Sequence, residues 1–531
     1  MIVKGQIVDI HNRSVYPGIV EFVDGVVISI TRDDTVAEAH YIMPGFIDAH
    51  VHIESSLLVP SEFARLAVMH GTVGTVSDPH EIANVCGMDG IRFMLDNASM
   101  VPFHFNFGAP SCVPATPFET AGAEISASDI AELFKDKRIK YLSEMMNWPG
   151  VLHDDAVVLE KLTIAREAGR PIDGHAPGLK GEQAQDYARH GITTDHECVA
   201  PDEALDKITA GMKVLIREGS AARNYEALHS LIGSHPDKVM FCCDDAHPDM
   251  LLEGHIDTHV KRSLAYGYNL FDVLRAASLN PVEHYGLDVG LLRVGDSADF
   301  IIVEDLQSFT VLETWVRGVQ VAEQGRSLID RVDVPLINNF DRDWVTMDQL
   351  HVEIAEHQLR IIVAHDGQLV TSEVHGRASD PDVLKLVVVN RYRNEPPAIA
   401  AIKGFGLERG AIASSVAHDS HNIVAVGTDD RSLVRAINGV IRMKGGLSIS
   451  ADDRTDILPL PVAGLMSAED AFAIAWHYSQ LSARATSLGS SLQAPYMTLS
   501  FMALLVIPQL KLSDKGLFDG QKFEFVDLVV S

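Results

Sequence analysis

Between Met43 and Tyr285 the sequence repeats the order strand, loop and helix eight times. The predicted strands are apolar runs at residues 46–52, 73–77, 102–108, 139–144, 171–175, 193–197, 213–217 and 239–244. Helical patterns such as PSEFARLAVMHG lie between them, and several end in glycine. Eight βα units in succession are typical of a TIM barrel, in which the chemistry lies at the carboxyl ends of the strands. We therefore predict an α/β chain whose residues 43–285 form a catalytic, TIM-like (β/α)8 barrel.

Polar side chains that can bind a metal ion stand at the ends of the predicted strands. They are His50, His52, Glu144, His175, His196 and Asp244. His50 and His52 lie two residues apart on one strand, so their side chains point to the same side. Each residue alone is more often a buried structural group, but six at these positions indicate a metal site. Four histidines and two carboxylates exceed the needs of one tetrahedral ion and suit two divalent ions, bridged by Glu144 and a solvent hydroxide. Asp245 is the alternative to Asp244, because the sequence does not show which of the two faces inward.

The segments on either side of the predicted barrel contain short strands and tight turns. Residues 1–42 include Asp24-Gly25 between two apolar runs, which is a strong hairpin signal. Residues 286–340 return to the same pattern after the barrel. Neither segment has enough strands to bury a face alone. We therefore expect the two to form one small β-sandwich domain.

Residues 341–531 are predicted to form a C-terminal α/β domain. Its motif AHDSHN, at residues 417–422, places His418 and His421 among polar residues. Two interpretations remain open: the loop covers the barrel mouth as a lid, or it satisfies only its own hydrogen bonds.

Composition narrows the class of partner. With 43 Lys and Arg against 73 Asp and Glu, the formal net charge is -30. This argues against nucleic acid or an anionic membrane as a partner, because both require a basic surface. There is no signal-peptide pattern, and the apolar run at residues 497–508 is too short to span a bilayer. The five cysteines, none in a CxxC spacing, indicate free thiols in a reducing cytoplasm. We expect a homo-oligomer, a dimer or higher.

The motif PGFIDAHVHIESS, at residues 44–56, resembles the first strand of the amidohydrolase superfamily. Further motifs resemble the members of this superfamily that deaminate adenine: TVSDPHEIANVCG, SEMMNWPGV, DGHAPGL, TTDHE, CCDDAHPD, EGHID and, near the C-terminus, ASSVAHDSHNIVAVG. The resemblance implies hydrolysis of adenine, a purine, to hypoxanthine and ammonia. It also implies two divalent ions, Mn²⁺ or Fe²⁺, with Zn²⁺ as an alternative.

Two features of the sequence argue against other hydrolases and other deaminases. Many binuclear members of the superfamily bridge their metals with a carbamylated lysine on the fourth strand, where this chain has Glu144. That difference weakens a dihydropyrimidinase or dihydroorotase interpretation. His52-Ile53-Glu54 matches half of the zinc-cysteine deaminase signature, but the PCxxC half is absent.

Deamination of adenine requires groups that move protons. A water must attack C6, the adjacent ring nitrogen must gain a proton, and the amine must leave protonated. We predict that Asp244 takes the proton of the water and that Glu81 protonates the ring. Asp78 and His80 share this task or orient Glu81. An equally strong interpretation is that Glu81 is a structural carboxylate that stabilises the N-terminus of a helix.

Substrate contacts are harder to predict than metal ligands. Arg217, Glu218 and Ser220 follow the seventh strand and are candidates for contact with the purine, although packing or helix capping explains them equally well. His421 is a further candidate, from the C-terminal loop. Two other functions remain open: hydrolysis of a cyclic amide or another aminopurine by the same metal pair, and a non-catalytic interaction protein on the same scaffold. All six candidate ligands are present, which disfavours the second.

Overall fold

The computed structural model describes residues 1–352 and 357–530. All eight predicted barrel strands are present in it. They are β5 (Phe46–Val51), β6 (Thr72–Ser77), β7 (His104–Ala109), β8 (Ile139–Met145), β9 (Ile172–Gly174), β10 (Thr194–Asp195), β11 (Lys213–Arg217) and β12 (Val239–Cys242). They form parallel sheets of five and three strands. Hydrogen bonds join the sheets at both edges, from Thr193 N to Ile172 O (2.8 Å) and from Asp244 N to His50 O (2.9 Å). The predicted TIM-like barrel is confirmed.

Helices surround the barrel strands and connect them. They are α1 (Pro60–Ala67), α2 (His80–Ala98), α3 (Ala127–Leu133), α4 (Trp148–Leu152), α5 (Ala156–Glu167), α6 (Gly181–Arg189), α7 (Pro201–Thr209), α8 (Tyr225–Leu228), α9 (Leu231–Ser234), α10 (Pro248–Glu253), α11 (Ile256–Ala265), α12 (Leu270–Leu274) and α13 (Asn280–Tyr285). The helix α2 directly follows β6, so its first turn, with His80 and Glu81, stands at the carboxyl end of that strand.

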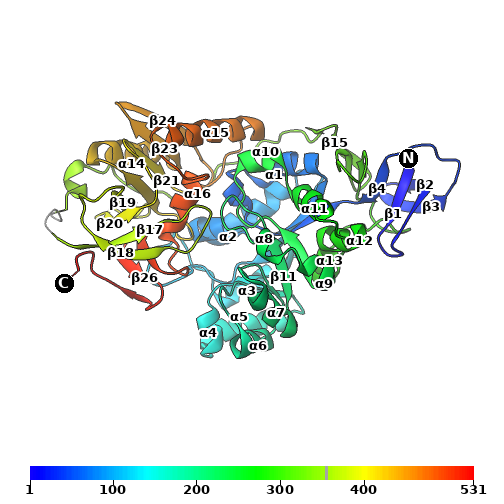
Figure 1. Cartoon of the computed structure of the whole chain (residues 1–531), viewed down its shortest axis with the longest axis horizontal. Helices are drawn as coiled ribbons and strands as arrows, with labels where there is room; N and C mark the ends of the chain where they lie inside the picture. The colour runs from blue at the N-terminus through cyan, green and yellow to red at the C-terminus, as the bar shows by residue number, and fades with distance from the viewer. Residues whose placement is uncertain (353–356, 531) are drawn as a thin grey trace.

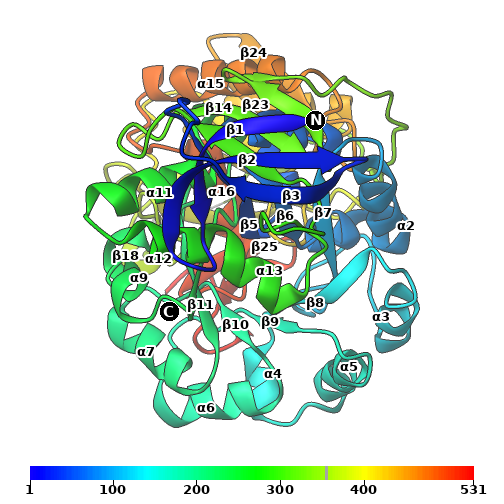
Figure 2. The ribbon, with the colours of Figure 1, turned by 90° about the vertical axis from the view of Figure 1, so that its right-hand side faces the viewer.

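The N-terminal and post-barrel strands share one sheet, as expected. Its order is β16 (Arg326–Ser327), β15 (Val319–Glu323), β14 (Val311–Val316), β13 (Phe300–Val303), β4 (Tyr41–Pro44), β1 (Ile2–Asp9), β2 (Ser14–Val23) and β3 (Val26–Arg32). The hydrogen bonding is continuous, but the sheet folds over so that Phe22 of β2 packs against Phe300 and Trp315, with ring centroids 5.6 and 5.5 Å away. Two layers therefore face each other, as in a sandwich. Figure 2 shows β1, β2 and β3 at the near end of the molecule.

The C-terminal region contains a second eight-stranded sheet. Its order is β18 (Ser372–Gly376), β17 (Leu359–Val363), β20 (Ala398–Lys403), β19 (Leu384–Val389), β22 (Ile423–Gly427), β21 (Ala411–Ser414), β23 (Gly446–Ala451) and β24 (Arg454–Pro459). The remaining elements are α14 (Asp430–Met443), α15 (Ala471–Ser487), α16 (Pro495–Ser500), β25 (Leu510–Ser513), β26 (Gly516–Asp519) and β27 (Glu524–Phe525). Helix α14 begins at a cap in which Asp429 accepts from Ser432 N, and it buries Leu433, Ile437 and Val440 on one face.

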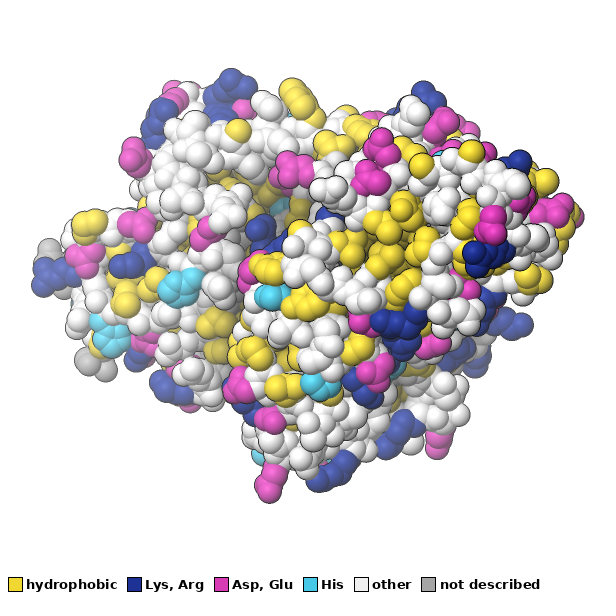
Figure 3. Space-filling model, turned by 45° about the vertical axis from the view of Figure 1, so that its right-hand side comes forward, with side chains coloured by type: hydrophobic (Ala, Val, Ile, Leu, Met, Phe, Trp, Pro, Cys, Tyr) yellow, Lys and Arg dark blue, Asp and Glu magenta, His cyan; other side chains and the backbone are white. Residues whose placement is uncertain are grey.

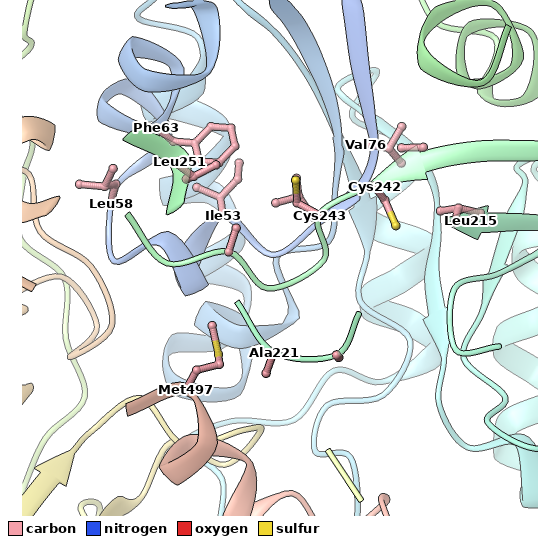
Figure 4. Close-up of a cluster of buried hydrophobic side chains, with 14 of the residues drawn as sticks. Ile53, Leu58, Phe63, Val76, Leu215, Ala221, Cys242, Cys243, Leu251 and Met497 are labelled. Carbon is pink, nitrogen blue, oxygen red and sulfur yellow. The ribbon is translucent and has the colours of Figure 1, made fainter. Parts of the chain in front are cut away.

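The barrel lies between the two eight-stranded sheets (Figure 1). The C-terminal sheet is on one side, and the sheet that contains β1 to β4 is on the other. The main apolar core is shared by the barrel and the C-terminal region. Figure 4 shows Met497 of α16 in one cluster with barrel residues such as Ile53 and Ala221. In the part of the chain that the structure describes, no helix is long and apolar enough to cross a membrane. On the face in Figure 3, basic side chains are interspersed with acidic ones.

Candidate metal centre and active site

The strand ends bring the six predicted ligands into one buried cluster. His50 lies on β5 and Glu144 on β8. His52, His175 and His196 directly follow β5, β9 and β10, and Asp244 comes two residues after β12. Each of the six is at most 6% exposed. His50 Nε2 and His52 Nε2 lie 3.2 Å apart. Asp244 has a left-handed backbone (φ 59°), a conformation that aspartate tolerates better than most residues, and it turns the chain at the end of the strand.

The two oxygens of Glu144 face two different sets of histidines. Its Oε1 lies 3.4 Å from His52 Nε2, and its Oε2 lies 2.8 Å from His175 Nδ1 and 3.1 Å from His196 Nε2. On the other side of the cluster, Asp244 Oδ1 lies 3.3 Å from His50 Nε2 and 3.1 Å from His52 Nε2. Glu144 therefore occupies the middle of the cluster, where a bridging ligand must be.

The donor atoms fit divalent cations. The atoms of His50, His196 and Asp244 lie within 4.8 Å of one another, and so do those of Glu144, His175 and His196. Imidazole nitrogens and carboxylate oxygens in these numbers suit Mn²⁺, Fe²⁺ or Zn²⁺. In addition, the buried His175 Nε2 has no hydrogen-bond partner among the described residues. This cluster of ligand atoms indicates a divalent metal centre.

The structure separates the roles of Asp244 and Asp245. Asp244 lies beside His50 and His52, whereas Asp245 accepts a hydrogen bond from the Ser55 hydroxyl at 2.5 Å. Arg217 Nη1 donates to Asp244 Oδ2 at 2.5 Å, which fixes that carboxylate. Burial raises the pKa of Asp244, but Arg217 and the two histidines outweigh it and hold the pKa well below its ordinary value. Asp244 is therefore held in the charged form that a metal ligand needs.

A second cluster extends from Glu81, in the first turn of α2. His418 Nδ1 and His421 Nε2, both from the C-terminal sheet region, each bond one oxygen of Glu81. His80 Nε2 lies 3.4 Å from Glu81 Oε1, and His80 Nδ1 lies 3.0 Å from Asp78 Oδ2. Burial raises the pKa of Glu81, but His418, His421 and His80 outweigh it and hold the pKa well below its ordinary value. This cluster connects to the first one, since His80 Nδ1 is 3.6 Å from Glu144 Oε1.

A cavity lies over both clusters, and both the barrel and the C-terminal region form its walls. Its lining residues are His52, His80, Glu81, Glu144, Met146, His175, His196, Glu197, Asp244, Asp245, Leu369, His418, Asp419, Phe501 and Leu504. It has about 20 Å³ of room for the centres of water molecules, enough for about one water. Anything larger requires its walls to move.

The structure does not bring the predicted substrate contacts to this cavity. Arg217 is buried and bonded to Glu197 and Asp244, Ser220 receives the backbone N–H of His247, and His421 faces Glu81. Glu218 pairs with Arg262. Arg217 and His421 thus contact carboxylates that line the cavity, and their contact with a purine stays a prediction.

Several lining residues were not predicted from the sequence. Glu197 has a signal, since it directly follows His196 and its Oε1 lies 3.4 Å from His196 Nε2. Asp419 lies inside the AHDSHN motif. Leu369, Phe501 and Leu504 are apolar residues among many others, and nothing in the sequence separates them from ordinary core.

Known proteins share both parts of the chain. Residues 41–321 match the model of the amidohydrolase family, and residues 356–524 match that of the adenine deaminase C-terminal domain. The adenine deaminase of Salinibacter ruber is 55% identical over 540 residues, covering 99% of each chain. That of a Sulfurovum species is 54% identical over 533 residues, again covering 99% of each. The adenine deaminase of Methanosarcina mazei is 50% identical over 547 residues, covering 99% of this chain and 98% of its own. The chain therefore belongs to the adenine deaminase family, within the amidohydrolases.

Proposed function

We propose that this chain hydrolyses adenine to hypoxanthine and ammonia. The observation that carries the proposal is the joint presence, on one cavity, of the Glu144-centred ligand cluster and of Glu81, a buried carboxylate suited to proton transfer. The names of the full-length relatives supply the substrate.

The proposed centre holds two divalent ions, Mn²⁺ or Fe²⁺, with Zn²⁺ as the alternative. His50, His52 and Asp244 would hold one ion, and His175 and His196 would hold the other, with Glu144 between the two sets. When bound, such a pair supplies the Lewis acidity that makes a water molecule reactive at neutral pH.

The residues of the chain move the protons. Asp244, fixed by Arg217, accepts the proton of the attacking water and passes it to the amine, which leaves as ammonia when its bond to C6 breaks. Glu81 is ionised in the resting site, so it first takes up a proton from His80, whose Nε2 lies 3.4 Å away, and then delivers it to the ring nitrogen beside C6. His418 and His421 hold its two oxygens in place. Asp78 positions His80 between Glu81 and Glu144, which gives the proton a route between the two clusters. A general acid of this kind contributes about 10²–10⁴-fold to the rate.

We also propose that residues 341–531 act as a lid over the barrel of residues 43–285. Residues from both segments line the cavity, and Leu369, Asp419 and Phe501 belong to the C-terminal one. Because the cavity is so small, substrate entry requires this lid to move away from the barrel.

The exposed surface and the cysteines bear on the assembly and the compartment. Large apolar side chains such as Trp344 and Trp476, each 65% exposed, support a homo-oligomer in which a second copy covers some of them. All five cysteines are unpaired, which supports a reducing cytoplasm. Light scattering coupled to gel filtration tests the oligomer, and a monomer would contradict it.

Ammonia release from adenine tests the reaction. The protein is purified from manganese-supplemented cells under iron chelation, and metals per chain are counted on the same sample. We expect rapid release with about two ions per chain, as a bridged pair requires. Two ions without adenine turnover would overturn the substrate assignment and redirect the search to cyclic amides and other aminopurines.

A further inference from the structure

The loop at residues 417–422 connects β21 to β22 and is completely buried against the barrel mouth, although it has no regular structure. Polar contacts fix it at several points. Asn422 donates to Thr120 O at 2.9 Å, and the Tyr392 hydroxyl donates to Ser420 O at 2.7 Å. The loop therefore presents its side chains to the cavity from a rigid frame.

Within this loop, the carboxylate of Asp419 is incompletely satisfied. Asp419 is 2% exposed and lines the cavity. Its Oδ1 lies 3.8 Å from His80 Nε2, while its Oδ2 has no hydrogen-bond partner among the described residues. A buried carboxylate oxygen without a donor is costly, and such groups in native proteins call for an explanation. A ligand that brings an N–H group into the cavity would supply the missing donor.

The neighbouring walls favour a flat ligand. The ring of His418 stacks on Phe501, with centroids 4.6 Å apart and an interplanar angle of 14°. Leu369 and Leu504 line the same cavity. Flat apolar surfaces with a few polar groups are typical of sites for planar heterocycles.

We propose that Asp419 binds the substrate by accepting a hydrogen bond from an N–H donor of the purine base. This inference rests on the proposed function for the identity of the base. Adenine carries two kinds of N–H donor, the ring N–H of its five-membered ring and its exocyclic amino group. His418 and His421 each bond Glu81 through one ring nitrogen, and both ring nitrogens of His80 face carboxylates. The Asp419 Oδ2 has no donor among the described residues, so it is a charged acceptor available to the base.

Equilibrium binding to the metal-loaded protein tests the proposal without requiring turnover. The probes, measured by calorimetry, are purine, which keeps the ring N–H but lacks the amino group, and 9-methyladenine, which keeps the amino group but lacks the ring N–H. We expect Asp419→Asn to weaken one of them by about 10- to 100-fold, as loss of a charged hydrogen-bond acceptor predicts. Weaker binding of purine alone assigns the ring N–H, and weaker binding of 9-methyladenine alone assigns the amino group. Unchanged binding of both would overturn the proposal.

The matched control is Asp514→Asn. Asp514 is also buried near this loop, but Thr120 N and Asn390 Nδ2 donate to its two oxygens and it does not line the cavity. We expect this variant to bind both probes like the wild type. Metals per chain must be equal in all three proteins, and a loss of metal in Asp419→Asn alone would count against a role in substrate binding.

A second readout separates this inference from the proposed function. With adenine as substrate, Asp419→Asn should raise KM about 10-fold or more while keeping both ions. If the wild type releases no ammonia from adenine, the proposed function fails whatever the variant does. If the wild type is active and KM does not change in the variant, only the role of Asp419 fails.

Discussion

Two buried clusters each include residues at or near the end of β5. They look alike in composition and differ in their hydrogen bonding. At the barrel mouth, His50 and His52 converge with Glu144 and Asp244. Deeper in the barrel, Asp48 of β5 meets His255 and Cys243 within a distance that would also allow a metal ion. In the deep cluster every polar contact is matched: His255 Nε2 lies 2.9 Å from Asp48 Oδ2, His255 Nδ1 lies 2.7 Å from the Thr72 hydroxyl, and Cys243 N donates to Asp48 Oδ1.

The difference shows what marks a site. The deep cluster pairs donors with acceptors and is complete without a ligand. At the mouth, histidine nitrogens and carboxylate oxygens surround common positions that an ion could occupy, and Glu144 lies between two sets of histidines. Burial of ionisable groups is common to both, so the convergence of electron-pair donors, rather than burial, identifies the metal centre.

A third case limits this lesson. Both ring nitrogens of the buried His259 lack hydrogen-bond partners among the described residues. Its ring packs near Phe241 and Tyr225, with centroids 5.1 and 6.1 Å away. His259 is therefore a neutral core residue, because burial among aromatic rings disfavours its charged form.

The largest expected effect comes from breaking the mouth cluster at its centre. Glu144→Gln removes the charge that both sets of histidines face, so we expect metal affinity to fall by more than about 100-fold, beyond the loss typical of outer residues. Turnover should fall with it. Metal analysis and ammonia release on the same sample check this. A fully active variant with two ions would show that Glu144 is not a ligand.

The next effect separates proton transfer from metal binding. Glu81→Gln should lower kcat by about 10²–10⁴-fold and leave the metal content unchanged. The matched control is Glu54→Gln, since Glu54 is equally buried, accepts from Ile82 N and does not line the cavity. We expect the control to keep most of its turnover. Near-normal turnover of Glu81→Gln would refute the proton-transfer role.

Breaking the deep cluster should affect stability rather than chemistry. Asp48→Asn leaves His255 without its charged partner, and we expect a loss of about 1–3 kcal/mol in the free energy of unfolding. The thermal midpoint should fall by several degrees, while the folded variant retains its metals. A loss of metal at unchanged thermal stability would show instead that the deep cluster binds an ion.

The smallest effect concerns the pH dependence of stability. Burial lowers the pKa of His259 to about 4, against about 6.5 for an unfolded histidine. Between these pH values the unfolded chain binds a proton at His259 that the folded chain does not bind. The contribution of His259 to the free energy of unfolding is therefore complete above pH 6.5 and is lost as the pH falls toward 4. The slope is at most about 1.4 kcal/mol per pH unit. His259→Leu should remove the part of the pH dependence that His259 causes. Thermal midpoints of the wild type and the variant at pH 7.5, 6 and 5 check this prediction. Parallel curves would contradict the prediction.

The barrel and the clustering of the six candidate ligands could be predicted because both depend on local periodicity. Strand residues two apart face the same side, which placed His50 and His52 together. A barrel brings the carboxyl ends of its strands to one mouth, which predicts that Glu144, His196 and Asp244 lie close together. The substrate contacts could not be predicted in this way. Arg217 follows a strand as a ligand would, but its charge is used to hold Glu197 and Asp244.

The sequence by itself determined the eight-stranded barrel, the sharing of strands between the two ends of the small sheet, and the strand-end positions of the six candidate ligands. Only the tertiary structure decided which side chains complete the cavity. His418 and His421 bond Glu81 across 337 and 340 residues of sequence. No periodicity within one element encodes such a contact, because it depends on how the C-terminal sheet packs on the barrel. For the same reason, the free oxygen of Asp419 became visible only when the surrounding donors had been placed.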